Sequence, residues 1–135
     1  MQKDEYRRRR HSKTLLYAHL IFVTKFREKL SEKWIWERVK YEIYKRCIAV
    51  GISVLRMESD TDRIHLLPEY PPTLSISTIA HDLKQVTTYS LWKHYPGYMR
   101  KHFRSRRVLW SGGYFACSVG NASKETVDAY IQQQG

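Results

Sequence analysis

The sequence has few cysteines, no long apolar run and few acidic residues, and each shortage excludes something. Cys47 and Cys117 are its only cysteines. Because they lack C-x-x-C spacing, we expect neither a zinc site nor a disulfide framework, only small buried side chains. No segment approaches the ~18 consecutive apolar residues that span a bilayer. The charged N-terminal residues are not followed by the apolar core of a signal peptide, so we expect a cytoplasmic protein with no membrane partner.

The shortage of acidic residues leaves a large positive charge. The 135 residues include 24 Lys or Arg against 13 Asp or Glu, a formal net charge of +11. Such a balance favours a polyanionic partner, with nucleic acid ahead of an anionic membrane surface. The ten Tyr and four Trp residues favour nucleic acid further. Aromatic faces stack on unpaired bases, although aromatic side chains also fill cores.

Length and composition predict one globular domain. The apolar fraction of 42% is that of a folded chain rather than a disordered tail. We expect residues 1–13 to form a basic arm and residues 14–135 to form the domain. The arm carries four successive arginines, which either grip phosphates or belong to a solvated, mobile end: Arg7, Arg8, Arg9 and Arg10.

Periodicity predicts alternating strands and helices in the first half. A strand over residues 15–25 is apolar on both faces and therefore central in its sheet. Ser31 is a good N-cap for the helix that follows, and Gly51 marks its end. Residues 52–58 and 63–70 form a hairpin with a tight acidic turn. The core stripe of the helix is Trp36, Val39, Ile43, Cys47 and Val50.

The second half continues the alternation. Ser75 or Ser77 caps a second helix, which Pro96–Gly97 terminates. A basic connection over residues 98–108 leads to a fourth strand over residues 109–119, where Gly112–Gly113 suggests a bulge or a close approach of another backbone. Residues 120–123 are expected as a hinge before a last helix over residues 124–134. The core stripe of the second helix is Ile76, Ile79, Leu83 and Val86.

The order of these elements predicts the fold class. It is β-α-β-β-α-β, the ferredoxin-like split βαβ plan, an α+β fold with a four-stranded antiparallel sheet and an extra C-terminal helix. Two sets of residues are candidates for nucleic-acid contacts. The first lies off the core stripe of the second helix: Lys84, Thr87, Thr88 and Lys93. The second lies in the basic connection, either a phosphate-contacting patch or a solvated loop: Arg104, Arg106 and Arg107.

Two short segments carry side chains suited to chemistry. Side chains alternate along a strand, so Arg63 and His65 share one face of the second hairpin strand while Ile64 faces the core. Far downstream, Tyr130 and Gln134 are four residues apart and share one side of the last helix. We expect these two segments to meet over DNA. Singly, His65 is also compatible with an ordinary surface histidine and Tyr130 with a helix-docking aromatic residue.

Five segments together carry a family resemblance. In order and spacing they resemble the single-tyrosine HUH transposases of the insertion-sequence 200/605 group, of the transposase A type. The resemblance covers about residues 14–134, most of the chain. The matching segments are Tyr17–Arg27, Glu58–Leu67, Pro72–Ser77, Leu109–Phe115 and Val127–Gln134.

The resemblance implies a DNA-cutting site. Tyr130 would be the nucleophile, leaving a 5′-phosphotyrosine and a free 3′ hydroxyl, and His65 and Gln134 would hold Mg²⁺ or Mn²⁺. A metal on the phosphate neutralises the charge that develops during transfer. The resemblance also implies a homodimer, in which the tyrosine helix of one subunit completes the partner's site. Its substrate would be single-stranded DNA with a hairpin.

Arg63 is the departure from this pattern, because it stands where the family has the first metal-binding histidine. A guanidinium has no lone pair for a metal and would repel a cation. Three explanations remain: a folded, DNA-binding copy impaired in cleavage, which we favour; Arg63 clamping the phosphate directly; or rescue of metal binding by another ligand. Asp62 is the weaker rescuer by strand alternation. His19 would serve only if its strand lies beside the second hairpin strand and His19 is on the matching face.

Other functions fit the same residues. A non-catalytic nucleic-acid-binding module on this fold is consistent with Arg63, and a domesticated relative that processes genomic palindromic repeats would have the same sequence features. An RNA-binding domain of the four-stranded recognition-motif type fits less well. Its third strand carries aromatic residues that stack on bases, and the sequence here is Arg-Ile-His-Leu-Leu.

Overall fold

The computed structural model describes residues 15–118 and residue 132. The expected basic arm with Arg7 to Arg10 lies outside the described residues. So do the expected hinge and most of the tyrosine helix, with Tyr130 and Gln134.

Four antiparallel strands form one sheet. They are β1 (Leu16–Val23), β2 (Ser53–Asp60), β3 (Arg63–Tyr70) and β4 (Phe115–Ser118), in the order β2-β3-β1-β4. The central pair is β1 with β3, in which Ile21 lies opposite His65. Connection of β1 to β2 and of β3 to β4 through helices gives the split βαβ topology, so the predicted fold class is confirmed.

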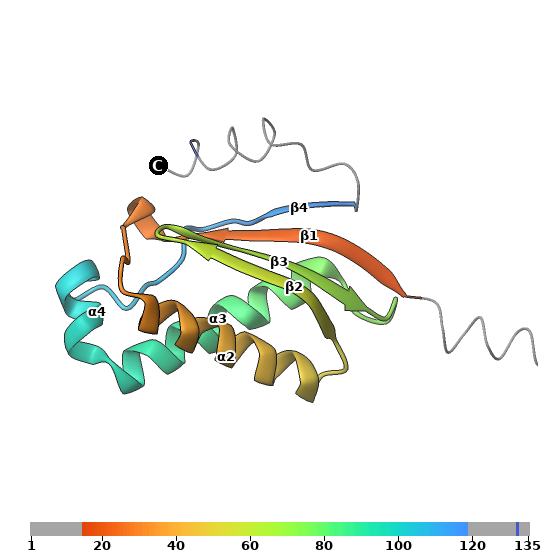
Figure 1. Ribbon diagram of the computed structural model, residues 1–135, viewed down its shortest axis with the longest axis horizontal. Coiled ribbons are helices and arrows are strands. Elements are labelled where there is room, and N and C mark those ends of the chain that lie inside the picture. The colour runs from red at the N-terminus through yellow and green to blue at the C-terminus, as the bar shows by residue number, and fades with distance from the viewer. Residues whose placement is uncertain (1–14, 119–131, 133–135) are drawn as a thin grey trace, which may run out of the picture.

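Two long helices cover one face of the sheet. Figure 1 shows α2 (Lys33–Ala49) and α3 (Ile76–His94) side by side beneath the strands. The main core lies between these layers, and its sheet side consists of fully buried alternate residues, among them Leu20, Phe22, Ile64 and Leu66. Burying each such side chain contributes about 1.5–3 kcal/mol. In the described part of the chain, no helix combines the length and the apolarity that crossing a bilayer needs.

A buried carboxylate joins the two long helices. Glu42 on α2 accepts a 2.6 Å hydrogen bond from Ser90 Oγ on α3 and pairs with Arg38 Nη2 at 2.9 Å and Lys45 Nζ at 3.1 Å. Burial opposes the charge of Glu42, but the hydrogen bonds from Ser90, Lys45 and Arg38 outweigh it and lower its pKa. A second link is Arg46, whose guanidinium donates to both oxygens of Asp82.

Most of the residues predicted to form the core faces of the two helices are buried in the structure. Trp36, Val39, Ile43 and Cys47 are buried on α2, whereas Val50 is partly exposed after the helix end. Gly51 follows at φ +81°, the left-handed conformation that glycine adopts without strain. Cys47 is fully buried, and burial raises the pKa of its thiol to about 11.

The caps differ in one place from the prediction. Ser75 caps α3 as expected, accepting from the backbone N–H of Thr78 at 3.0 Å. At the start of α2, however, Glu32 and not Ser31 occupies the cap position, without a side-chain cap hydrogen bond. The Glu32 carboxylate accepts from the Tyr98 hydroxyl at 2.8 Å instead. On α3, Ile79 and Leu83 are buried while Ile76 and Val86 are only partly so.

The prediction of an irregular basic connection over residues 98–108 was wrong in its first half. Residues Pro96–Phe103 form the helix α4. Pro96 occupies the first helical position, where its missing N–H costs nothing, so it begins a helix as well as ending the previous one. Met99 and Phe103, four residues apart, bury their side chains in the core.

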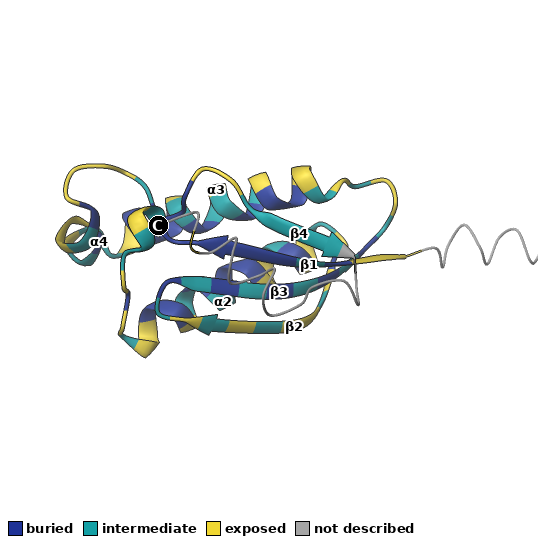
Figure 2. Cartoon of the chain, turned by 90° about the horizontal axis from the view of Figure 1, so that it is seen from above, coloured by how far each residue is buried: buried dark blue, intermediate teal, exposed yellow. Residues whose placement is uncertain are grey.

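The fourth strand is shorter than predicted. Regular pairing is confined to Phe115–Ser118, and the segment before it makes one isolated bridge, between Trp110 and Thr24. Gly112–Gly113 therefore separates the bridge from the strand instead of forming a bulge within it. Figure 2 shows that the central strand β1 is largely buried, whereas the edge strand β2 is more exposed.

Candidate functional site

The sheet face opposite the helices carries the polar side chains of interest. On β1 the residues Leu20 and Phe22 point into the main core, so His19 and Ile21 point to this second face. On β3, Ile64 and Leu66 are buried while Arg63 and His65 are partly exposed, as the alternation predicted. Phe115 packs here against Ile21 and Val23.

His19 and His65 meet on this face. Because His65 lies opposite Ile21, His19 is its diagonal neighbour across the β1–β3 pair. His19 Nδ1 and His65 Nε2 are 2.9 Å apart, and the ring centroids are separated by 5.0 Å. The condition set for His19, that its strand must lie beside the hairpin strand with a matching face, is therefore met.

The pKa of His65 is lowered. Burial is the main cause, and the neighbouring His19 contributes because two protonated imidazoles would repel. Glu58, its cross-strand partner on β2, acts in the opposite direction. Glu58 is itself held by Arg56, whose Nη2 lies 2.8 Å from Oε1. The lowered pKa favours a neutral His65 with a lone pair at neutral pH.

Arg63 is drawn away from the histidine pair toward the hairpin turn. Its Nε donates to Asp62 Oδ1 at 3.1 Å, and its Nη2 lies 3.6 Å from Asp60 Oδ2. These two carboxylates offset the charge that the guanidinium places near His65. The hydrogen bond to Asp62 also occupies Nε, one of the donors with which Arg63 would clamp a phosphate.

Asp62 organises the loop beside the site, a role that the sequence analysis missed. Its side chain is 0% exposed and accepts from Arg27 Nε at 3.3 Å and Lys29 Nζ at 3.0 Å in addition to Arg63. Burial opposes its charge, but the bond from Lys29 and the charge of Arg63 outweigh burial and lower its pKa. Asp62 is therefore committed to three cations and is not free to hold a metal.

The hairpin turn also holds a neighbouring loop whose backbone conformation is unusual. Phe26 and Arg27 have φ of 60° and 51° within the short 3-10 helix η1 (Lys25–Arg27). Such angles cost free energy for residues with a side chain. The hairpin turn holds this loop by backbone bonds from Thr24 N to Asp62 O at 2.9 Å and from Leu30 N to Thr61 O at 2.8 Å. The sequence signal for this contact was an acidic residue in a tight turn together with basic residues at positions 25–29.

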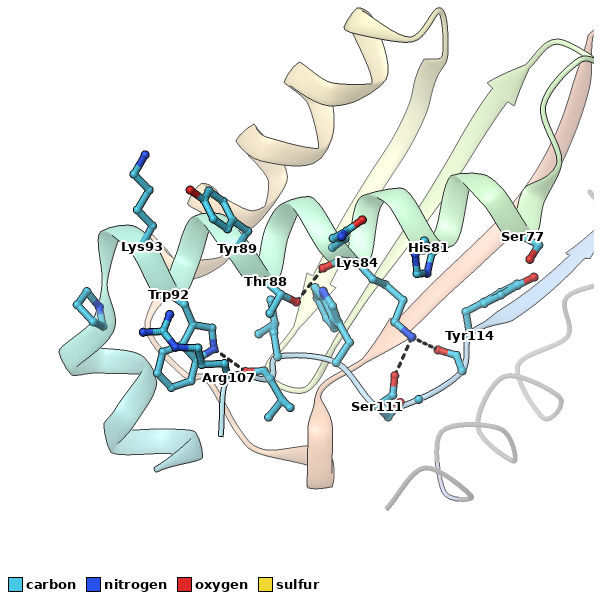
Figure 3. A pocket seen from close by; sticks show the side chains of 17 residues that line it. Ser77, His81, Lys84, Thr88, Tyr89, Trp92, Lys93, Arg107, Ser111 and Tyr114 are labelled. Atoms are coloured by element: carbon cyan, nitrogen blue, oxygen red, sulfur yellow. Dashed lines mark hydrogen bonds between the residues drawn. The ribbon is translucent and has the colours of Figure 1, made fainter. Parts of the chain in front are cut away.

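A second feature is a groove between α3 and the segment 107–114. Its volume is about 1040 Å³, and Figure 3 shows its lining. No acidic side chain of the described segments lines it. The basic residues around it are His81, Lys84, Lys93 and Arg107. This charge suits a phosphate backbone.

Aromatic residues alternate with the basic ones in the groove. Tyr89 is 67% exposed, and Lys93 Nζ lies 5.8 Å from its ring centroid. Arg107 lies over the ring of Trp92, at 5.5 Å, while Trp92 Nε1 donates to Val108 O. An exposed ring flanked by cations can stack on an unpaired base and hold its phosphate. The spacing of Tyr89 and Lys93 at i and i+4 was the sequence signal for this.

The predicted DNA contacts have different surroundings in the structure. Lys84 Nζ donates to the carbonyls of Ser111 and Gly113, at 2.8 and 2.9 Å, so it braces the groove wall. Thr87 was predicted to face away from the core and is instead buried, accepting from Trp110 Nε1 at 2.8 Å. Arg104 and Arg106 are exposed, and Arg106 lies over the Phe26 ring.

The chemistry of the histidine pair tests whether the site fits a metal. Two imidazole nitrogens bound to one ion at ~2.1 Å lie about 3.0–3.4 Å apart, close to the 2.9 Å between His19 and His65. Among the described residues no group of three His, Cys, Asp or Glu side chains could hold an ion. The pair therefore fits an ion whose remaining ligands come from other residue types, from segments beyond those described or from substrate.

Comparison with known proteins gives consistent relatives. The transposase for insertion sequence element IS200 of Salmonella typhimurium is 27% identical over 92% of this chain and 80% of its own length. The ISDra2 transposase TnpA of Deinococcus radiodurans is 24% identical over 88% of this chain and 84% of its own.

Solved structures share the fold. A candidate transposase from Deinococcus radiodurans superposes with a TM-score of 0.80 at 22% identity, over 90% of this chain and 92% of that one. A REP-associated tyrosine transposase bound to a REP hairpin gives a TM-score of 0.58 at 8% identity, over 86% of this chain and 62% of that one.

The family comparison covers nearly the whole sequence. The family described as "Transposase IS200 like" matches residues 12–134. The resemblance inferred from the five sequence segments is confirmed, and this chain belongs to the IS200-like transposase family.

Proposed function

We propose that this protein cuts and rejoins single-stranded DNA through a tyrosine intermediate, with Tyr130 as nucleophile. The observation that carries the proposal is the His19–His65 pair, on the sheet face opposite α2 and α3, in a chain of this family. His65 and Gln134 are the proposed holders of a divalent metal, Mg²⁺ or Mn²⁺. The wider DNA surface is the basic and aromatic groove along α3.

The proposed reaction is a transesterification at one phosphorus. The Tyr130 oxygen forms a bond to phosphorus as the bond to the 3′ oxygen breaks, and the phenolic proton ends on the departing 3′ hydroxyl. A phenol with a pKa of ~10 is a weak nucleophile at neutral pH. The metal, when bound, supplies positive charge to the phosphate oxygens. The phosphotyrosine keeps the phosphoester bond, so a second 3′ hydroxyl can reverse the step without ATP.

The proposed substrate is single-stranded DNA that carries a hairpin, and the proposed assembly is a homodimer. The net charge of +11 and the groove without acidic lining support a DNA partner. The solved REP-associated relative was bound to a REP hairpin. Sharing of sites between subunits predicts that a mixture of Tyr130→Phe and His65→Ala proteins forms more adduct than either alone.

Covalent capture tests the enzymatic proposal. The full chain is incubated with Mn²⁺ and a labelled single-stranded oligonucleotide that carries a hairpin. The oligonucleotide is a suicide substrate, whose strand cannot be rejoined once the protein has cut it. We expect a labelled protein band on a denaturing gel, absent for Tyr130→Phe. The panel of substrates consists of palindromic sequences from the host genome that the chain binds. If the unmodified chain gives no labelled band with any of them, the proposal is overturned.

A second candidate function is favoured by one observation. Arg63 lies on β3 at the position where the family resemblance implies the first metal-binding histidine, which suits a non-catalytic binder of single-stranded nucleic acid or a domesticated relative acting on genomic palindromes. Tight hairpin binding without an adduct would identify this function. Return of the adduct in Arg63→His would identify Arg63 as the cause.

A further inference from the structure

The two histidines on the sheet face opposite the helices have the geometry of a ligand pair. His19 Nδ1 and His65 Nε2 approach within 2.9 Å from neighbouring strands, with ring planes at 49°. Two imidazole nitrogens at that distance share either a proton or a cation. Both side chains are partly exposed, on the sheet face away from α2 and α3.

Position 63 does not supply a ligand. A guanidinium has no lone pair to donate, and Arg63 is bonded to Asp62 and drawn toward Asp60. Asp62 is held by three cations, as described above. His19 is therefore the nearest described group able to join His65 on one ion.

We propose that His19 Nδ1 and His65 Nε2 are two ligands of one divalent transition-metal ion, so that β1 supplies the ligand that β3 lacks. A catalytic role for this metal site rests on the proposed function. Metal binding itself does not require DNA cleavage and can be tested separately.

The donor atoms determine the class of metal. Imidazole nitrogen suits Co²⁺, Ni²⁺ and Zn²⁺, and affinity rises along the first-row series, whereas Mg²⁺ prefers oxygen ligands. Among the described residues, no third His, Cys, Asp or Glu side chain joins the pair in a group that could hold an ion. Two protein nitrogens leave positions for oxygen ligands, which a phosphate oxygen of DNA can occupy. We therefore expect a preference for Co²⁺, Ni²⁺ and Zn²⁺ over Mg²⁺.

Cobalt binding to the untagged full chain tests the proposal. Cys117→Ser serves as the background, because a thiol also binds Co²⁺ and Cys117 lies opposite His19 on β4. Affinity is measured by competition with a chromophoric chelator, and the visible absorption of bound Co²⁺ reports nitrogen ligands. We expect His19→Ala and His65→Ala each to lower affinity at least 10-fold. The exposed His94→Ala, on α3, is the matched control and should change it less than 2-fold.

A positioning role for His19 predicts a different result. Glutamine at position 19 can still hydrogen-bond to His65, but it offers a metal only an amide oxygen in place of the imidazole nitrogen. If His19 is a ligand, His19→Ala lowers Co²⁺ affinity, and both His19→Ala and His19→Gln lose the absorption that the His19 nitrogen contributes. Unchanged Co²⁺ affinity in His19→Ala, or an unchanged absorption spectrum in His19→Gln, would overturn the proposal. Circular dichroism and thermal unfolding without metal check that each variant is folded.

Failure of this proposal and of the proposed function can be told apart. Loss of Co²⁺ binding in His19→Ala, with no Tyr130 adduct from the unmodified chain, would support the metal pair and count against the cleavage reaction. An adduct from the unmodified chain together with Co²⁺ affinity indifferent to His19 would do the reverse.

Discussion

Arg63 Nε donates to Asp62 Oδ1 at 3.1 Å. Arg63 shares a sheet face with His65, and the hydrogen bond ties its guanidinium to the hairpin turn that precedes β3. Arg63 is only 29% exposed on its side chain, and its partner is fully buried. The Arg63 guanidinium is thus held by carboxylates of the same hairpin.

Replacing Arg63 by histidine should strengthen metal binding. Arg63→His removes a positive charge and adds an imidazole on the face of His65, so Mn²⁺ affinity should rise at least 10-fold, with more Tyr130 adduct. Isothermal titration and the capture assay measure the two effects. Arg100→His on the exposed side of α4 is the control. No gain in either measurement, with the variant folded, would show that position 63 does not limit the site.

Neutralising Asp62 should destabilise the protein. Asp62→Asn loses charged partners for Arg27, Lys29 and Arg63, and because these cations are partly exposed we expect a loss of about 2 kcal/mol in the free energy of unfolding. Urea denaturation measures it. Asp60→Asn, 66% exposed, should lose less than about 0.5 kcal/mol.

The same residue predicts an acid dependence of stability. The folded pKa of Asp62 lies below its usual value of ~3.9. Its contribution is therefore fully present above the unfolded pKa and is lost as pH falls through the folded pKa. Below about pH 4, the stability difference between the unmodified chain and Asp62→Asn should shrink; a difference that stays constant down to pH 2 would contradict this origin.

The groove should bind unpaired bases through Tyr89. Tyr89→Ala should weaken binding of single-stranded DNA by about 1–3 kcal/mol, whereas Tyr89→Phe keeps the ring and should bind normally. Fluorescence anisotropy with hairpins that carry unpaired flanks measures both. Equal losses in the two variants would point to the hydroxyl instead of stacking, and no loss in either would exclude this ring from the DNA surface.

The link between α2 and α3 should contribute to stability. Ser90→Ala removes the 2.6 Å hydrogen bond to the buried Glu42 carboxylate, and we expect the free energy of unfolding to fall by about 1–3 kcal/mol. The exposed Ser105→Ala is the matched substitution and should have little effect. A loss that persists when Glu42 is already replaced by leucine, which cannot accept a hydrogen bond, would mean that the serine acts through another contact.

The sequence predicted the fold well where the pattern is local. Residues 63–70 form β3 as expected, Ser75 caps α3, and Gly51 has the left-handed conformation after α2. Helix α4 was missed because proline and glycine at its start are also stop signals. The core pair Met99–Phe103 was the pattern that indicated the helix.

The site required information that is not local. Alternation along β3 was enough to assign Arg63 and His65 to one face. Contact between His19 and His65 depends on which strands pair and in what register, and the pattern of β1 alone does not determine either. The burial of Asp62 among three cations likewise depends on the fold of the preceding loop. The roles of Tyr130 and Gln134 stay predictions from the family resemblance.

The burial of Cys47 has a practical consequence. Its thiol is enclosed by the core, and the pKa of about 11 leaves almost no thiolate at neutral pH. In a Cys117→Ser background, labelling of this one sulfur therefore proceeds only from molecules whose core has opened. The chain contains its own reporter of spontaneous unfolding, readable by mass spectrometry with DNA or metal present or absent.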